Sequence, residues 1–238
     1  MFNFKEKIVV VTGAAGNLGE AVAHAFLLAG ARMILVDRAV DRLPKMFPNL
    51  IGSSEHFLAT STDSTDADSI QELVTQSVRR FGRIDVLVHT VGGYQAGKPL
   101  HLTTLKTLDF MFNLNARTTY LASQAVITIM LKQGAGKIVN VASRQGLAGT
   151  KNSSAYSAAK AAVIRLTESM SAELKLQNIN VKCVLPGTID TPQNRSDMPN
   201  ADYNRWVKPN SLAGVILFLA SQAAQDIHGA VLPVYGKS

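Results

Sequence analysis

The sequence predicts a single α/β domain over residues 1–238, built on a doubly wound parallel sheet of about seven strands with helices on both faces. Short apolar runs, with the length of buried strands, alternate along the chain with longer helical patterns. Apolar residues make up 47% of the chain and charged residues 17%, as in a globular protein with a buried sheet. No linker rich in proline and glycine, internal repeat or low-complexity tract divides the sequence.

The first element is an unbroken β-branched run at 8–11, which is short enough to be a strand buried on both faces. A helical pattern follows at 20–29. Gly13, Gly16 and Gly19 therefore lie on a strand-to-helix turn. Such a turn presents bare backbone N–H groups and a helix N-terminus, which together attract a pyrophosphate.

A second buried run at 33–36 ends in Asp37, eighteen residues after Gly19. A carboxylate at this place accepts hydrogen bonds from an adenosine ribose and repels a 2′-phosphate, so it favours NAD over NADP. Arg38 can pair with such a phosphate, stack near the adenine or point into water, so NADP is the alternative. A tight structural turn followed by a surface aspartate is the competing interpretation. Strand, turn, helix, strand and terminal acid in this order favour a dinucleotide site.

The elements up to the middle of the chain follow from similar signals. Pro44 and Pro48 break a short helical stretch. Asp66 or Asp68 can cap the next helix, and Gly82 ends it. The expected elements are a short helix within 38–50, a strand at 56–60, a helix at 69–81, a strand at 84–89 and a long helix at about 103–132.

The second half continues the alternation and ends in one more strand. Ligands of parallel sheets bind outside the carboxyl ends of the strands, so the segments that follow the strands are the ones expected to form the site. The polar segment at 188–209 is expected to be irregular and to serve as a substrate loop, with Trp206 as an apolar flap. The remaining elements are strands at 137–142, 179–185 and 230–235 and helices at 153–176 and 212–220.

Three side chains after the fifth predicted strand indicate proton transfer. Ser143 follows that strand directly, and Tyr156 and Lys160 stand four residues apart on one face of the next helix. A tyrosine with its usual pKa near ~10 is a poor base at neutral pH. An ammonium one turn away favours the phenolate, so we expect Lys160 to lower the pKa of Tyr156 while Ser143 holds a substrate oxygen beside the phenol. The spacing alone would equally describe an exposed helix pair, but its place after the serine and the glycine-rich turn favours a catalytic group.

At these residues the sequence resembles the short-chain dehydrogenase/reductase (SDR) family, whose fold is Rossmann-like, and the resemblance covers nearly the whole chain. Several independent motifs in the right order make it specific. They are TGAAGNLG at 12–19, the acid of VDR at 36–38, Asp63 after the third strand, the second asparagine of NLNA, NVAS ending at Ser143, YSAAK at 156–160 and PGTIDT at 186–191.

The resemblance implies an oxidoreductase that transfers a hydride between NAD(P) and a carbonyl or secondary alcohol, with Tyr156 as the general acid/base and Ser143 orienting the substrate oxygen. Lys160 would bind the nicotinamide ribose, and Asn115 would carry a water-linked proton relay to it. A homo-oligomer, tetramer or dimer, would form on the two long helices. The residues implied to contact the cofactor are Gly13, Gly16, Asn17, Leu18, Gly19, Asp37, Arg38, Asp63, Gly92, Tyr156, Lys160, Gly187, Ile189 and Thr191.

Two of these residues have structural alternatives, and three motifs depart from the family pattern. Asn115 could be a satisfied core or kink residue, and Thr191 a turn residue before proline. Asn17 stands where the family usually has glycine, and asparagine tolerates a left-handed backbone. HTVG at 89–92 replaces Asn-Asn-Ala-Gly and so removes amides that brace the sheet, unless its histidine substitutes as a hydrogen-bonding group rather than packing as a neutral ring. VYG at 234–236 replaces Asp-Gly-Gly, with no catalytic effect expected.

Composition excludes several other classes of protein. The net charge is +7, but no basic cluster interleaves with aromatic residues as in a nucleic-acid-binding face. No apolar run has the length of a membrane span, and the opening MFNFKEK lacks the apolar core of a signal peptide. The single cysteine, Cys183, lies in an apolar run and suits a reducing cytoplasm. The five histidines show no metal-ligand spacing, so no metal is expected.

The sequence determines the identity of the substrate less closely than the type of reaction. The predicted walls of its site are 93–98, 144–154 and 188–209, which carry six cations and few acids. An anionic or acyl-carrier-bound substrate would explain them, and solvated loop charges explain them equally well. Two rival functions stay open: a 3-oxoacyl-carrier-protein reductase using NADPH, and a dinucleotide-binding regulatory protein without turnover. The six cations are Lys98, Arg144, Lys151, Arg195, Arg205 and Lys208.

Overall fold

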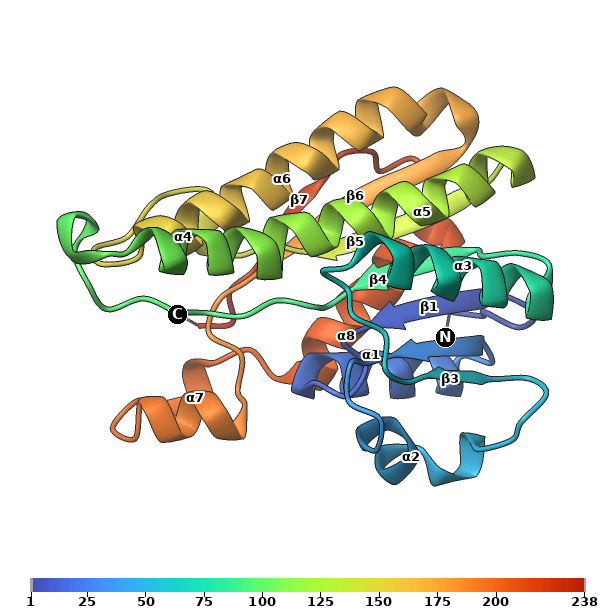
Figure 1. Cartoon of the computed structure of the whole chain (residues 1–238), viewed down its shortest axis with the longest axis horizontal. Helices are drawn as coiled ribbons and strands as arrows, with labels where there is room; N and C mark the ends of the chain where they lie inside the picture. Colours follow the sequence, from blue (N-terminus) through green and yellow to red (C-terminus); the bar gives the residue numbers. More distant parts are fainter. Residues whose placement is uncertain (1, 238) are drawn as a thin grey trace.

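Seven parallel strands form one sheet in the computed structural model, which describes residues 2–237. The strand order is β3-β2-β1-β4-β5-β6-β7, so β1 (Ile8–Thr12) and β4 (Val86–His89) are neighbours at the point where the order reverses. This confirms the predicted doubly wound, Rossmann-like sheet, and it places the topological switch point between these two strands (Figure 1). The other strands are β2 (Arg32–Val36), β3 (Phe57–Ala59), β5 (Gly136–Val141), β6 (Ile179–Pro186) and β7 (Val231–Val234).

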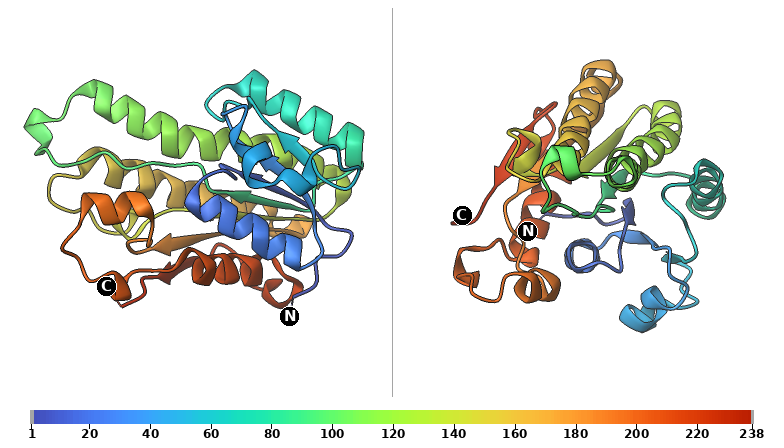
Figure 2. Two further views of the ribbon diagram at one scale, coloured as in Figure 1. Left: turned by 90° about the horizontal axis from the view of Figure 1, so that it is seen from below. Right: turned by 60° about the vertical axis from the view of Figure 1, so that its left-hand side comes forward.

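Helices cover both faces of the sheet (Figure 2). Side chains alternate along β1: Val9 and Val11 belong to one core cluster, with residues of α1 and α8, whereas Ile8 and Val10 belong to another, with residues of α3, α5 and α6. Both sides of the strand are therefore buried, which is why β1 reads as an unbroken apolar run. The helices are α1 (Asn17–Leu28), α2 (Arg42–Met46), α3 (Ala67–Phe81), α4 (Leu105–Met111), α5 (Thr118–Gln133), α6 (Ser154–Leu174), α7 (Pro192–Asp197) and α8 (Pro209–Ala220).

The caps of α3 agree with the sequence. Asp66 is the N-cap and accepts a hydrogen bond from the Asp68 backbone N–H, and Gly82 ends the helix in a left-handed conformation. The start of α1 differs from the prediction, because the helix begins at Asn17, three residues before the predicted start at residue 20. Asn17 is thus helical and needs no left-handed backbone, and the first turn of the helix reaches back into the glycine-rich turn.

The long helix predicted at about 103–132 is not continuous. Between α4 and α5, Phe112–Arg117 forms a π-helical segment that contains Asn115. The side-chain amide of Asn115 donates to Met111 O at 3.0 Å, and the Thr119 hydroxyl donates to Asn115 O at 2.7 Å. These side chains supply hydrogen bonds within a turn that is wider than an α-helical one. The helix therefore bulges at the residue that the family resemblance singles out.

Three prolines lie in the first turns of short helices, where the missing N–H costs nothing. Pro44 is inside α2 rather than at a break, and Pro48 begins a 3₁₀ turn, Pro48–Leu50. Pro192 begins α7, so the prediction that 188–209 is irregular is wrong in part: the segment contains α7 and a 3₁₀ turn, Tyr203–Arg205. In Figure 1, α7 and the segment leading into α4 lie beyond the carboxyl ends of the strands. No helix in the described part of the chain is long and apolar enough to cross a membrane.

Candidate active site

The glycine-rich turn at the end of β1 is too tight for side chains at its key positions. Gly13 has φ +68° and the Gly16 N–H donates to Gly13 O at 2.9 Å. A Cβ on Gly19 would lie 2.1 Å from Gly13 O. Gly16 caps α1 without a side-chain hydrogen bond, so the N–H groups of the first turn, which includes Asn17 and Leu18, have no cap from a side chain. This backbone fits the pyrophosphate of a dinucleotide.

Asp37, at the end of β2, keeps one carboxylate oxygen available. Its Oδ1 accepts from the Ala39 N–H at 2.9 Å and lies 4.0 Å from Arg42 Nη1, whereas its Oδ2 has no hydrogen-bond or ion-pair partner among residues 2–237. An available oxygen at this place fits a ribose hydroxyl. Arg42, which the sequence reasoning missed, also donates to Ala15 O and so connects Asp37 to the glycine-rich turn. The sequence spacing does not predict this contact, because it joins a short helix to a turn 27 residues earlier.

Arg38 follows β2 and Asp63 follows β3, at the carboxyl edge of the sheet where the adenine would bind. Asp63 Oδ1 accepts from the Thr65 N–H at 2.8 Å and from the Thr65 hydroxyl at 2.7 Å. These two hydrogen bonds, with a smaller contribution from the charge of Arg38, lower the pKa of Asp63. Arg38 itself is exposed. Both residues are thus near the predicted adenosine end, and their contacts with a cofactor stay a prediction.

His89 is buried at the end of β4 and forms hydrogen bonds with both ring nitrogens. Nδ1 lies 2.8 Å from Thr12 Oγ1 at the end of β1, and Nε2 lies 3.1 Å from Thr118 Oγ1 at the start of α5. Because the Thr118 hydroxyl donates to Leu114 O, it accepts from Nε2–H, and Nδ1 accepts from the Thr12 hydroxyl. Burial, helped by the charge of Lys160, lowers the pKa of His89 to about 3. His89 is therefore both a packed neutral ring and a hydrogen-bonding brace between two strands and a helix.

Thr90 braces the glycine-rich turn from the same strand. Its hydroxyl donates to Thr12 O at 2.7 Å, and its backbone N–H donates to the same oxygen at 3.2 Å. A Cβ on Gly13 would lie 3.1 Å from Thr90 Oγ1, so the two segments are in close contact. The HTVG sequence thus replaces the missing amides with an imidazole and a hydroxyl rather than leaving the sheet unbraced.

Asn115, Gly92 and Lys160 meet beside this brace. Asn115 pairs with the backbone of Gly93, since its Nδ2 donates to Gly93 O and its Oδ1 accepts from the Gly93 N–H, both at 3.2 Å. A Cβ on Gly92 would lie 2.9 Å from Asn115 Oδ1 and 3.1 Å from Lys160 Nζ. Only glycine lets the loop pass so close to both side chains. Both polar atoms of the Asn115 side chain therefore bind the loop that follows β4. A proton relay through Asn115 stays a prediction.

The structure brings Ser143, Tyr156 and Lys160 together at the carboxyl end of β5. Ser143 Oγ accepts from the Gln145 N–H at 3.2 Å and lies near enough to the Tyr156 phenol to influence its pKa. Lys160 Nζ lies 6.0 Å from the centre of the Tyr156 ring and donates to Val141 O at 2.9 Å. The serine thus lies beside the phenol and the lysine near its ring, and the predicted hold of Ser143 on a substrate oxygen stays a prediction.

The pKa shifts differ from the expected ones. Burial raises the pKa of Tyr156, the hydrogen bond with Ser143 opposes this rise, and Tyr94 adds to it. Burial also lowers the pKa of Lys160 to about 8. The expectation of a lowered Tyr156 pKa is wrong for this structure, because the phenol is buried and Lys160 is not among the groups that shift its pKa.

Tyr94 lies in the predicted wall 93–98, but it was not singled out from the sequence. Its ring packs edge-on against Tyr156, with ring centres 4.8 Å apart and planes at 82°. It is 63% exposed, so one side of the ring is open to a ligand. An aromatic residue directly after Gly92-Gly93, where the loop from β4 enters the predicted site, was the available signal.

The segment after β6 is held in place by its own hydrogen bonds. The Gly187 N–H donates to Val234 O at 3.0 Å, and Ile189 forms a parallel bridge with Val207 that closes the base of the segment 188–209. Thr191 Oγ1 accepts from the Asn194 N–H at 3.1 Å as the N-cap of α7. The structural alternative for Thr191 is therefore realised in this structure, and contacts of these residues with a nicotinamide stay predictions. Trp206 is 7% exposed and packs against Tyr203, so it is buried in the segment rather than lying open as a flap.

Several of the loop cations have local partners. Asp190 pairs with Arg195 (Nε to Oδ1, 2.6 Å) and with Lys208 (Nζ to Oδ2, 2.5 Å), and these contacts strongly lower its pKa. Arg205 donates to Lys237 O at 3.1 Å, and Arg144 lies over the ring of Tyr235. These cations are structural in part and are weaker evidence for an anionic substrate than the sequence suggested. No cluster of three or more metal-ligating side chains occurs within residues 2–237.

The comparisons with known proteins agree with this geometry. The family model described as "short chain dehydrogenase" matches residues 7–202. The chain is 32% identical to 7alpha-hydroxysteroid dehydrogenase of Bacteroides fragilis (99% of this chain, 95% of the relative) and 34% identical to 3-oxoacyl-[acyl-carrier-protein] reductase of Thermotoga maritima (97% and 96%). A solved structure of ElxO with NADP bound superposes with a TM-score of 0.89 at 29% identity, over 97% of each chain. Because the family match spans most of the chain and the relatives match it over nearly their whole length, the chain belongs to the short-chain dehydrogenase family, oxidoreductases that use NAD(P) and act on alcohols and ketones.

Proposed function

We propose that this protein transfers a hydride between NAD and a secondary alcohol or ketone, with Tyr156 as the general acid/base, Ser143 orienting the substrate oxygen and Lys160 holding the nicotinamide ribose. The observation that carries the proposal is the convergence of Ser143, Tyr156 and Lys160 at the same edge of the sheet as the glycine-rich turn. The cofactor supplies the hydride chemistry, and the chain supplies position and the proton.

Replacement of Tyr156 by phenylalanine tests this role. Tyr156→Phe removes the proton donor without removing the ring that packs against Tyr94. We expect kcat to fall by at least about a hundredfold on a panel of secondary alcohols and ketones, because general acid/base catalysis contributes that much. Cofactor affinity, followed by nicotinamide fluorescence, should stay within about twofold. A variant that keeps its turnover would exclude Tyr156 as the acid/base.

NAD is the proposed cofactor because Asp37 offers a carboxylate oxygen without an intramolecular partner to a ribose hydroxyl, and it repels a 2′-phosphate. The exposed Arg38 and the nearby Arg42 favour the alternative, NADP. Titration with NADH and NADPH separates the two, and Asp37→Ser should raise the relative affinity for NADPH about tenfold by removing the repulsion. A wild-type preference for NADPH would mean that the arginines dominate.

The two rival functions make different predictions in the same assays. A 3-oxoacyl-carrier-protein reductase, the activity named for the Thermotoga relative, would prefer NADPH and reduce carrier-bound thioesters. A regulatory protein without turnover would bind the dinucleotide and show the same behaviour before and after Tyr156→Phe. The departure of HTVG from the family pattern favours a regulatory protein, but the hydrogen bonds of His89 and Thr90 weaken this argument, because they brace the sheet.

We further propose that residues 1–238 act as one catalytic domain in the cytoplasm, with 188–209 as its substrate loop, and that the chain forms a homotetramer or homodimer. The π-interrupted pair α4 and α5 exposes several large apolar side chains, which a second copy would bury. Light scattering on the purified protein measures the assembly directly. The exposed side chains are Leu105, Phe110, Phe112, Tyr120 and Leu131.

A further inference from the structure

A cavity of about 150 Å³ lies beside the proposed catalytic group, between the loop after β4, the start of α4 and the start of α6. The Gly97 N–H donates to Asn152 O at 2.8 Å and joins two of these walls. The Thr103 hydroxyl donates to Lys98 O at 3.3 Å and joins the loop to the segment before α4. The cavity is thus framed by hydrogen bonds rather than by loosely placed loops.

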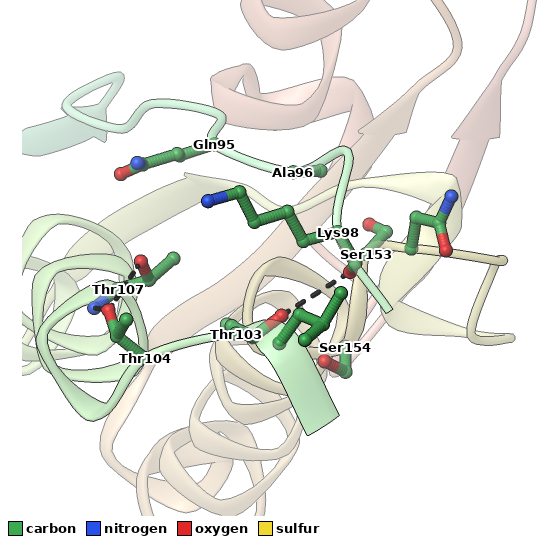
Figure 3. A pocket seen from close by; sticks show the side chains of 11 residues that line it. Gln95, Ala96, Lys98, Thr103, Thr104, Thr107, Ser153 and Ser154 are labelled. Carbon is green, nitrogen blue, oxygen red and sulfur yellow. Dashed lines mark hydrogen bonds between the residues drawn. The ribbon is translucent and has the colours of Figure 1, made fainter. Parts of the chain in front are cut away.

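The lining of the cavity carries one charged side chain, Lys98, and no acid. In Figure 3 the Lys98 side chain extends along the cavity in the direction of Gln95 and Thr107. Lys98 forms no ion pair with any residue of the part that the structure describes, in contrast to Arg195 and Lys208, which share Asp190. A cation without a carboxylate partner, at the wall of a cavity, attracts an anion.

The other polar groups of the lining suit the oxygens of that anion. Five lining residues carry a hydroxyl, and the Ser154 hydroxyl is inaccessible to solvent and has no hydrogen-bond partner within residues 2–237. Buried polar groups are normally hydrogen-bonded, and rotation of the Ser154 hydroxyl into the cavity would let a ligand oxygen supply the partner that the chain does not. The single charge of Lys98 balances the one negative charge of a carboxylate, whereas a phosphate monoester carries about −1.5 to −2 at pH 7.

The cavity adjoins the reacting centre without including it. Its lining contains Gln95, which directly follows Tyr94, and Ala155, which directly precedes Tyr156. A substrate that reaches Tyr156 and passes the exposed ring of Tyr94 would meet the cavity at its far end. The group bound in the cavity and the reacting carbon would therefore belong to opposite ends of one molecule.

From this geometry we propose that the cavity is a carboxylate subsite, with Lys98 as its cation, and that the substrate is a hydroxy or keto acid whose carboxylate lies several atoms from the reacting carbon. This inference rests on the proposed function for the location of the reacting carbon. It narrows the substrate class from alcohols and ketones in general to compact acids, and it distinguishes them from carrier-bound thioesters, which lack a free carboxylate.

Binding of unreactive probes tests the subsite directly. Calorimetric titration of the full chain, saturated with NADH, compares cyclohexanecarboxylate with the neutral cyclohexanecarboxamide of similar shape. We expect the carboxylate to bind more tightly, and Lys98→Gln to weaken it about tenfold while leaving the carboxamide within about twofold, because only the charged contact is lost. Lys106→Gln is the matched control, since Lys106 is exposed on α4 and does not line the cavity.

Kinetic assays separate this proposal from the proposed function. Lys98→Gln should raise KM for 5-oxohexanoate about tenfold and leave both kcat and the KM for its methyl ester unchanged. If wild type shows no preference for the carboxylate probe, or if Lys106→Gln has the same effect as Lys98→Gln, the subsite is wrong. Turnover of neutral ketones that depends on Tyr156, without a carboxylate preference, would overturn the subsite alone. Carboxylate binding through Lys98 without any hydride transfer would overturn the proposed function alone.

Discussion

Lys160, on α6, and Lys182, in β6, are both buried, but their side chains have different hydrogen-bond partners. Lys160 has one acceptor, Val141 O, and approaches within reach of Gly92 at the carboxyl edge. Lys182 has three acceptors at 2.6–2.8 Å, which use all the hydrogens of an ammonium. Burial lowers the pKa of both, to about 8 and about 7. Both lysines are thus buried and have a lowered pKa. They differ in the number of ammonium hydrogens without an acceptor, and Lys160, which has such hydrogens, is the one that can bind a ligand.

The acceptors of Lys182 explain its position. They are Asn180 Oδ1, Leu219 O near the end of α8 and Ala224 O in the 3₁₀ turn that follows. The last carbonyls of a helix have no partner within the helix, and a cation there is favourable. Lys182 therefore fastens α8 to the inside of β6, and no donor remains for another molecule.

Replacement of Lys160 should give the largest effect. Lys160→Met removes the donor next to Gly92 and the proposed contact with the nicotinamide ribose, and we expect kcat/KM to fall about a thousandfold, roughly 4 kcal/mol. Lys182→Met, measured at a temperature where it is folded, should keep kcat/KM within about threefold. Steady-state kinetics of the two variants side by side check this. Equal losses of activity would mean that unused donors do not separate the two lysines.

Replacement of Lys182 should give the larger loss of stability. Lys182→Met removes one donor from each of three buried oxygens. Two of them keep a weaker donor, since Lys137 Nζ donates to Asn180 Oδ1 and the Ile227 N–H donates to Ala224 O, both at 3.2 Å. We expect the free energy of unfolding to fall by about 3 kcal/mol. Denaturant unfolding followed by circular dichroism measures it. Lys175→Met, at an exposed position in the 3₁₀ turn Lys175–Gln177 that precedes β6, is the control and should change stability by less than about 0.5 kcal/mol. A fall below about 1 kcal/mol for Lys182→Met would show that the oxygens find other partners.

His89 extends the comparison of the two lysines. It lies at the catalytic edge of the sheet, like Lys160, but both of its ring nitrogens have hydrogen-bond partners, as the ammonium of Lys182 does. His89→Leu leaves the hydroxyls of Thr12 and Thr118 without this partner, and we expect a loss of about 2 kcal/mol in unfolding free energy. The lost brace should also raise the KM for the dinucleotide, with a smaller change in kcat. His89→Asn tests rescue, since an amide can both donate and accept. An unchanged dinucleotide KM in His89→Leu would show that the brace serves the fold alone.

The sequence predicted the sheet well for a physical reason. Strands buried on both faces must be apolar runs, so β1, β2 and β4 to β6 are visible in the sequence within one or two residues. The four-residue spacing of Tyr156 and Lys160, together with the position of Ser143 after β5, was enough to predict that these three side chains lie close together. Local chemistry also identified the caps Asp66 and Gly82.

The features that the sequence did not predict arise from contacts between distant residues. Asn115, within the π-helical segment, pairs with Gly93, 22 residues earlier in the chain. The partners of Lys182 at Leu219 and Ala224 are 37 and 42 residues later. A lysine inside a strand that is otherwise apolar was the available signal for such partners, because a buried ammonium needs acceptors. The raised pKa of Tyr156 likewise depends on how deeply the phenol is buried, which helical spacing does not express.

The smallest expected effect concerns the dependence of stability on pH. Because the pKa of Lys182 is about 7 in the folded protein and near ~10.4 in an unfolded chain, the unfolded state binds more protons between these values. Stability therefore rises with pH in this window and falls as pH drops toward 7. Lys160 contributes in the same direction above pH ~8. The raised pKa of the Cys183 thiol, about 12, opposes the rise above pH ~8.5, where an unfolded thiol ionises.

The measurement is therefore restricted to pH 7.0–8.5, about the range where Lys182 dominates. We expect the free energy of unfolding of the wild type to rise by about 1 kcal/mol more than that of Lys182→Met across this range, from denaturant titrations at several pH values. Lys175→Met should follow the wild-type curve, since its side chain is exposed. Parallel curves for wild type and Lys182→Met would mean that the three acceptors keep Lys182 charged as readily as water does. Its burial would then carry no proton linkage, and the two lysines would differ in titration as well as in their unused donors.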